Sequence, residues 1–159
     1  MLQRSIKVRK SLLAGVHQKG YSLPKKRFPY KECDSGIFGT VKRPLISLDV
    51  KSSGGIWIHL RDVLADTGAD LSMLPRDIGE LVVEDITKGK TIELRGVVPY
   101  ARLLVFIHEL YFRVDGKEFI APTAIAESND VIPILGRTKG LDLFAVVFEK
   151  GKTTSFTLE

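Results

Sequence analysis

The chain has 159 residues, of which 44% are hydrophobic and 27% charged. This balance is normal for one globular domain and excludes a chain of disordered or fibrous composition. The single cysteine, Cys33, excludes an internal disulfide and a cysteine-based zinc cluster. No apolar run approaches the roughly 20 residues that a membrane helix needs, and we expect a protein of the cytoplasm without a membrane partner.

The net charge of +5 is unevenly distributed along the chain. Residues 1–31 contain nine Lys or Arg and no acid, whereas the remainder carries 15 basic and 19 acidic residues. We interpret residues 1–41 as a basic N-terminal extension, with a weak helix or disorder in 1–19 and an irregular connection over 20–43 rich in Gly, Pro and Lys. A nucleic-acid tether is one reading of the extension, but a solvated tail is favoured because interleaved aromatic residues are missing.

From residue 42 onward the pattern predicts short strands. Alternating apolar residues over 45–50 and 56–60, separated by Ser52-Ser53-Gly54-Gly55, predict a hairpin. A helical turn is expected within 74–82, then strands over 91–95 and 103–114. Asp115-Gly116 is typical of a two-residue hairpin turn. A buried strand over 131–135, a short helix over about 138–144 and a last hairpin over 145–158 complete an all-β barrel or sandwich in residues 42–159.

The strongest chemical signal is Asp66-Thr67-Gly68, which follows the apolar run Val63-Leu64-Ala65. A strand would hold the carboxylate rigidly, while the glycine permits a tight turn and close backbone approach. The similar triplet Asp34-Ser35-Gly36 lacks a preceding apolar strand, and we interpret it as an ordinary turn.

About seventy residues after Asp66, the segment Ile134-Leu135-Gly136-Arg137 forms another apolar run that ends in Gly-Arg. This order resembles the retropepsin-like (clan AA) aspartic proteases, over roughly residues 42–159, and in particular their small single-lobe prokaryotic members. The resemblance implies a closed barrel with one short C-terminal helix, active as a homodimer. It also implies a flap, for which the counterpart is the segment from Gly96 to Tyr100, although this segment carries one glycine plus Pro99 where retroviral flaps are glycine-rich.

The resemblance also implies roles for individual residues. Asp66 is the expected catalytic group, Thr67 locks the two loops across the dimer, and Gly68 holds the substrate backbone. Gly136 and Arg137 give structural support, with Arg137 pairing with Asp70 either structurally or at the substrate. The strand over 153–158 is expected to help build the dimer interface. The remaining expected substrate-binding residues are Ala69, Asp70, Gly96, Val97, Val98 and Tyr100.

These residues predict an aspartic endopeptidase that hydrolyses peptide bonds with one Asp from each subunit. Because only one credible catalytic loop is present, the second carboxylate must come from another copy. A catalytically silent dimerisation or binding module on the same fold is the alternative, and a nucleic-acid-associated protein is a third. We expect no cofactor and no metal, since His17, His59 and His108 match no metal-binding motif. His59 and His108 are expected to be surface or hydrogen-bonded residues of strands.

Overall fold

A computed structural model of the chain describes residues 23–95 and 102–158. The described part is built mainly of short strands, as the sequence predicts. The strands are β1 (Lys25–Pro29), β2 (Lys31–Ser35), β3 (Gly39–Arg43), β4 (Leu45–Lys51), β5 (Trp57–Ala65), β6 (Ser72–Leu74), β7 (Lys90–Arg95), β8 (Arg102–Val114), β9 (Lys117–Ala126), β10 (Ile134–Leu135), β11 (Ala145–Glu149) and β12 (Thr153–Thr157). The helical segments are α1 (Arg76–Val82) and the 3-10 turns η1 (Ile86–Lys88) and η2 (Leu141–Leu143).

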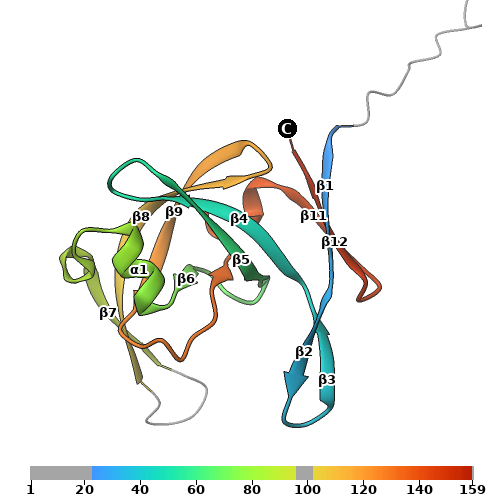
Figure 1. Cartoon of the computed structure of the whole chain (residues 1–159), viewed down its shortest axis with the longest axis horizontal. Coiled ribbons are helices and arrows are strands. Elements are labelled where there is room, and N and C mark those ends of the chain that lie inside the picture. Colours follow the sequence, from blue (N-terminus) through green and yellow to red (C-terminus); the bar gives the residue numbers. More distant parts are fainter. Residues whose placement is uncertain (1–22, 96–101, 159) are drawn as a thin grey trace, which may run out of the picture.

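The largest sheet closes into a barrel. Its strand order is β4-β5-β10-β6-β9-β8-β7, and an additional pairing of β4 with β8 joins the first strand to the sixth. Figure 1 shows this barrel with α1 packed on its outside. The predicted all-β closed barrel is therefore confirmed, and closure leaves few free strand edges in it.

Alternation of apolar and polar residues explains why these segments become strands. In β8, Leu110, Phe112 and Val114 are almost fully buried, whereas the residues between them face outward. In β4, Ile46 and Val50 are buried in the same core. Removing one apolar face of each strand from water is the main force that holds the barrel together.

The predicted hairpins are confirmed. β4 pairs with β5, and β11 pairs with β12 across Lys150 and Gly151. At the turn between β8 and β9, Asp115 has φ +47° and Gly116 has φ +88°. Positive φ at both central residues is the geometry of the turn type that suits a two-residue hairpin.

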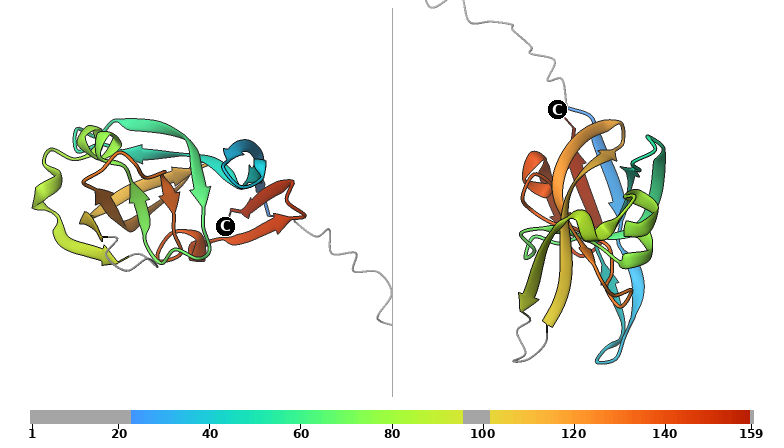
Figure 2. Two further views of the ribbon diagram at one scale, coloured as in Figure 1. Left: turned by 90° about the horizontal axis from the view of Figure 1, so that it is seen from below. Right: turned by 90° about the vertical axis from the view of Figure 1, so that its left-hand side faces the viewer.

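A second sheet, of strand order β1-β12-β11, lies beside the barrel (Figure 2). Contacts between aromatic rings join this sheet to the barrel. Phe156 of β12 packs edge-to-face on Phe28 at 5.7 Å and on Phe144 at 5.4 Å, measured between ring centroids. Phe144 in turn contacts Phe119 of the barrel at 5.5 Å. Edge-to-face aromatic contacts of this kind fix geometry as well as burying area.

Three expectations from the sequence are wrong in the described residues. The buried strand expected over 131–135 is reduced to the two residues of β10, and Ile132 is 44% exposed. The segment expected to be irregular over 20–43 contains β1, β2 and β3. Pairing of β1 with β12 and burial of Phe28 override the local Gly, Pro and Lys signals. The short helix expected over 138–144 is the 3-10 turn η2 alone. The division into residues 1–41 and 42–159 stays a prediction, which independent folding of 42–159 would test.

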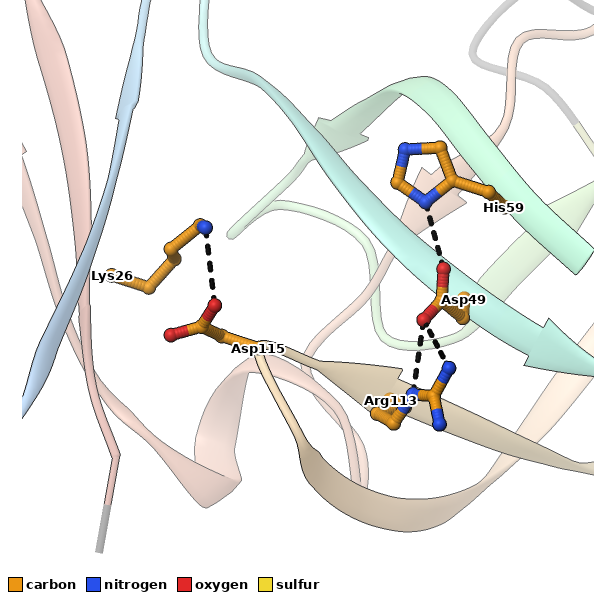
Figure 3. A network of polar contacts seen from close by, with 5 residues as sticks. All are labelled: Lys26, Asp49, His59, Arg113 and Asp115. Carbon is orange, nitrogen blue, oxygen red and sulfur yellow. Dashed lines mark hydrogen bonds and ion pairs between the residues drawn. The ribbon is translucent and has the colours of Figure 1, made fainter. Parts of the chain in front are cut away.

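Charged side chains connect strands on the outer surface of the barrel (Figure 3). The Asp49 carboxylate accepts hydrogen bonds from Arg113, with Nη2 at 2.8 Å, and lies 2.7 Å from His59 Nδ1. Lys26 of β1 pairs with Asp115 at 3.1 Å. Burial works to raise the pKa of Asp49, but the hydrogen bonds from His59 and Arg113 outweigh it and hold that pKa below its ordinary value of 3.8.

Candidate active site

The Asp66 loop begins where β5 leaves the core of the barrel. Val63 and Ala65 are buried on β5, and the strand runs parallel to β10, with Ala65 opposite Leu135. The Asp66 backbone N–H donates to the Leu135 carbonyl at 3.1 Å. Asp66 is therefore attached directly to the segment that ends in Gly136-Arg137, as the two sequence motifs together suggest.

The loop folds back on the Asp66 carboxylate. The Gly68 N–H donates to Asp66 Oδ1 at 2.8 Å, and the Ala69 N–H donates to the Asp66 carbonyl at 3.3 Å. Thr67 and Gly68 are exposed, while Asp66 is half-buried. A backbone donor thus orients one oxygen of a carboxylate that is still reachable from solvent.

Gly136 lies against the backbone of the loop. A Cβ atom at this position would stand 2.4 Å from the carbonyl carbon and oxygen of Leu71 and 2.8 Å from the Ser72 nitrogen. No side chain fits at such distances, so this close approach requires glycine. The predicted supporting role of Gly136 has a physical basis here.

Two backbone hydrogen bonds continue the contact beyond Gly136. The Arg137 N–H donates to the Ala69 carbonyl, and the Thr138 N–H donates to the Asp70 carbonyl, both at 2.9 Å. The structure thus brings together the predicted site residues Asp66 to Asp70 with Gly136 and Arg137.

Ser72 is a residue of this region that the sequence does not reveal. Its side chain is 1% exposed, and its Oγ accepts a hydrogen bond from the Gly136 N–H at 3.1 Å. A buried N–H without an acceptor is costly, so Ser72 stabilises the crossing of the two segments. Nothing in the sequence Leu71-Ser72-Met73 distinguishes it from an ordinary strand serine.

The expected side-chain pairing of Asp70 with Arg137 does not form. Arg137 pairs instead with Asp142, at 3.3 Å between Nε and Oδ1. The 3-10 turn η2 brings Asp142 to this side of Arg137, whereas Asp70 is joined to the segment through its backbone carbonyl. Both partners of the actual pair are about half exposed, so it contributes little to stability.

A cavity of about 360 Å³ lies beside the loop. Thr67 of the loop lines it together with apolar side chains of η2 and β11. The full lining is Thr67, Arg137, Leu141, Asp142, Phe144, Val146 and Phe148. Thr67, predicted to contact a second subunit, therefore opens onto a partly apolar hollow.

The expected flap residues Gly96, Val97, Val98 and Tyr100 lie outside the described residues. The strands on either side of them are described, and β7 pairs antiparallel with β8 up to Arg95 opposite Arg102. The predicted strand over 91–95 and the long strand over 103–114 are thus confirmed.

Other candidate groups take ordinary structural roles. His59 contacts Asp49, and His108 Nε2 lies 2.8 Å from the Ile86 carbonyl oxygen. Ser35 Oγ accepts hydrogen bonds from the N–H groups of Ile37 and Phe38. Asp34 and Ser35 end β2, and Gly36 opens the turn that leads to β3, so the triplet belongs to a hairpin. Within residues 23–95 and 102–158, no group of three or more His, Cys, Asp or Glu side chains is placed to hold a metal ion. The same residues contain no helix long and apolar enough to cross a membrane.

Comparison with known proteins supports the fold. No family model matches the chain, and no curated protein matches it in sequence. A retropepsin-like aspartic protease from Rickettsia conorii is similar in structure, with 18% identity, a TM-score of 0.53 and coverage of 86% of this chain and 94% of that one. The protease of EIAV in complex with the inhibitor HBY-793 also matches, with 21% identity, a TM-score of 0.38 and coverage of 60% and 83%. The barrel, the crossing of its two loops and the similarity to the Rickettsia structure together show that the chain has the retropepsin-like fold.

Proposed function

We propose that the protein is an aspartic endopeptidase in which Asp66 supplies one of two catalytic carboxylates. The observation that supports this most is the position of Asp66 directly after β5. Its backbone N–H donates a hydrogen bond to the Leu135 carbonyl, and its carboxylate accepts one from the Gly68 N–H. A carboxylate held rigidly by backbone groups yet open to solvent is suited to acid-base chemistry on a bound water.

The mechanism needs a second carboxylate close to the first. Two acids about 3 Å apart share one proton, so one activates the water as a base while the other protonates the leaving group. In the described residues, the other triplet of this type, at Asp34, belongs to the β2–β3 hairpin. The proposed enzyme is therefore a homodimer in which the Asp66 residues of the two copies lie next to each other across a two-fold axis.

The proposed substrate is an unstructured polypeptide bound in an extended conformation. Gly68 and Asp70 are exposed and Ala69 is half-buried, and all three are proposed to lie beside such a chain. The Gly68 N–H and both backbone polar groups of Ala69 already have partners within the protein. The segment from Gly96 to Tyr100 is proposed to close over it. The lone Cys33, which is free, fits a reducing compartment, and the cytoplasm is the proposed location.

A comparison of the wild type with two variants on an unstructured peptide library tests the proposal. The wild type and Asp34→Asn, which alters the similar triplet outside the site, are expected to cleave the same bonds at mildly acidic pH. Asp66→Asn is expected to lose at least about 10²-fold in rate. Cleavage by all three at equal rates would remove Asp66 from the mechanism. No cleavage by dimeric wild-type protein would favour the alternative of a silent binding module.

Mixing tests the shared site separately. Asp66→Asn protein added to wild type should lower activity by more than dilution, because inactive mixed dimers form. A strictly proportional loss would show that each chain works alone.

A further inference from the structure

Strand β5 contains an extra residue shortly before the loop of the candidate active site. Its pairing with β4 shifts between Ile46 and Leu48 of β4. In this interval β4 has Ser47 alone, whereas β5 has both Arg61 and Asp62. Two residues that oppose one form a β-bulge, a feature that bends a strand and can change the direction of the side chains that follow it.

The bulge reverses which residues of β5 face the core. In a regular strand successive side chains point to opposite faces, so an inward Leu60 would place residues 62, 64 and 66 on the core side as well. Arg61 and Asp62 are instead both exposed, and Val63 and Ala65 are buried in the same core as Leu60. After the bulge, the odd-numbered residues therefore face the core.

Asp66 follows the alternation that the bulge establishes. The Leu64 N–H donates to the Pro133 carbonyl at 2.9 Å, and the Asp66 N–H donates to the Leu135 carbonyl at 3.1 Å. Donors two residues apart are the repeat of a strand, so Asp66 shares a face with Leu64 and lies opposite the buried Ala65. Without the extra residue, the same repeat would direct the Asp66 carboxylate into the core, where an unpaired charge is costly.

The backbone at Asp62 is what accommodates the extra residue. Asp62 has φ +59°, in the left-handed region that Gly, Asn and Asp adopt far more readily than β-branched residues. The Asp62 carboxylate also contacts Lys31 Nζ, but the two side chains are 56% and 47% exposed. An ion pair so open to water contributes little. The backbone conformation of Asp62, more than its charge, therefore holds the bulge.

We propose that Asp62 is a positioning residue, whose left-handed conformation maintains the bulge that turns the Asp66 carboxylate away from the core and towards the candidate site. Only the catalytic consequence rests on the proposed function, since the direction of the Asp66 side chain is a property of the fold. Residue 62 must then tolerate a positive φ, whereas a carboxylate at this position is dispensable.

Labelling of carboxyl groups tests the direction of Asp66 without reference to any reaction. A carbodiimide and a small amine modify exposed carboxyl groups, and mass spectrometry of the peptides gives the extent at each residue. The exposed Asp34 serves as the internal reference. Asp62→Gly and Asp62→Asn should label at Asp66 as the wild type does, because both residues tolerate a positive φ. Asp62→Val should lower Asp66 labelling severalfold, because a β-branched residue leaves this region.

Peptide cleavage by the same variants measures the catalytic consequence. Asp62→Val is expected to lower kcat by about 10²-fold and to change KM much less, because the reacting group is displaced. Asp62→Gly and Asp62→Asn should retain kcat close to that of the wild type. A loss of Asp66 labelling and of kcat in Asp62→Gly as large as in Asp62→Val would overturn the proposal, because the carboxylate and not the backbone would then be needed.

Asp115→Val is the matched control. Asp115 also has a positive φ, +47°, and also pairs with a lysine, Lys26, but it lies in the turn between β8 and β9. This variant should lower the thermal midpoint about as much as Asp62→Val, while Asp66 labelling and kcat stay at the wild-type level. A fall in Asp66 labelling as large as that of Asp62→Val would show a general loss of structure and would overturn the proposal.

If Asp62→Val does not fold, Asp62→Ala gives the deciding measurement, because alanine disfavours a positive φ less strongly than valine. Asp66 labelling that is unchanged in the folded variant overturns the proposal. The two failures are distinguishable. Altered labelling without cleavage by any protein, wild type included, would contradict the proposed function and leave the positioning role intact. Unchanged labelling with full Asp66-dependent cleavage would do the reverse.

Discussion

Two regions of the barrel are held together by different means. At the loop crossing, defined here as residues 66–72 with 135–138, backbone groups contact backbone groups and leave no free space at Gly136. On the outer surface, Asp49, His59 and Arg113 join β4, β5 and β8 through side chains that are partly in water. The geometry of the candidate site is thus fixed by the main chain, whereas the exterior relies on interactions that solvent can partly replace.

This difference predicts the largest effect at Gly136. Gly136→Ala forces the two backbones of the loop crossing apart, because the new methyl group would stand 2.4 Å from Leu71. We expect a loss of about 3 kcal/mol or more in the free energy of unfolding, or failure to fold, since the neighbouring atoms are backbone and cannot rotate away. Denaturant unfolding measures it. Gly36→Ala is the control, as a methyl group there meets no atom within 4 Å.

The next largest effect is expected at Gly68, and it concerns activity more than stability. A Cβ atom there would lie 3.2 Å from Asp66 Oδ1, in an exposed loop that can yield. We expect Gly68→Ala to displace the carboxylate slightly and to lower kcat of the proposed peptidase reaction by about 10²-fold, because small misplacements of reacting groups are costly. The measurement is kcat alongside the thermal midpoint. A fall in the thermal midpoint as large as that of Gly136→Ala would contradict the prediction that Gly68→Ala affects activity more than stability.

The contrast also explains what the sequence could reveal. Asp66 and Gly136 could be predicted because each lies in a short motif next to an apolar strand, and local patterns encode both. The contacts of Ser72 with Gly136 and of Asp142 with Arg137 could not, since both form only after the chain folds. β1 escaped prediction for the same reason: its strand conformation depends on β12, more than a hundred residues away.

At Ser72, within the loop crossing, we expect a loss of stability of intermediate size. Ser72→Ala leaves the buried Gly136 N–H without its acceptor at 3.1 Å. The expected cost is about 1–3 kcal/mol, the penalty for an unsatisfied buried donor. Ser53→Ala, at an exposed serine, should change stability by less than about 0.5 kcal/mol. Equal effects of the two substitutions in denaturant unfolding would show that the Ser72 hydroxyl is not needed.

The smallest effect is expected on the outer surface, and it should depend on pH. Hydrogen bonds from His59 and Arg113 hold the pKa of Asp49 below 3.8 despite the opposing effect of burial. A carboxyl group with a lowered pKa stabilises the fold above its unfolded pKa, and this contribution disappears as the pH falls through the folded value. Asp49→Asn should therefore cost about 1 kcal/mol at neutral pH, and the difference from wild type should shrink below about pH 4.

Urea unfolding at neutral pH and at about pH 2.5 measures this difference. Asp115→Asn is the matched control, because Asp115 pairs with Lys26 at 3.1 Å in a contact that is more exposed than that of Asp49. Its cost should be near zero at both pH values. A cost at Asp49 that stays the same in acid would mean that packing, and not the charge, stabilises this site. The outer surface would then resemble the loop crossing more closely than its exposed ion pairs suggest.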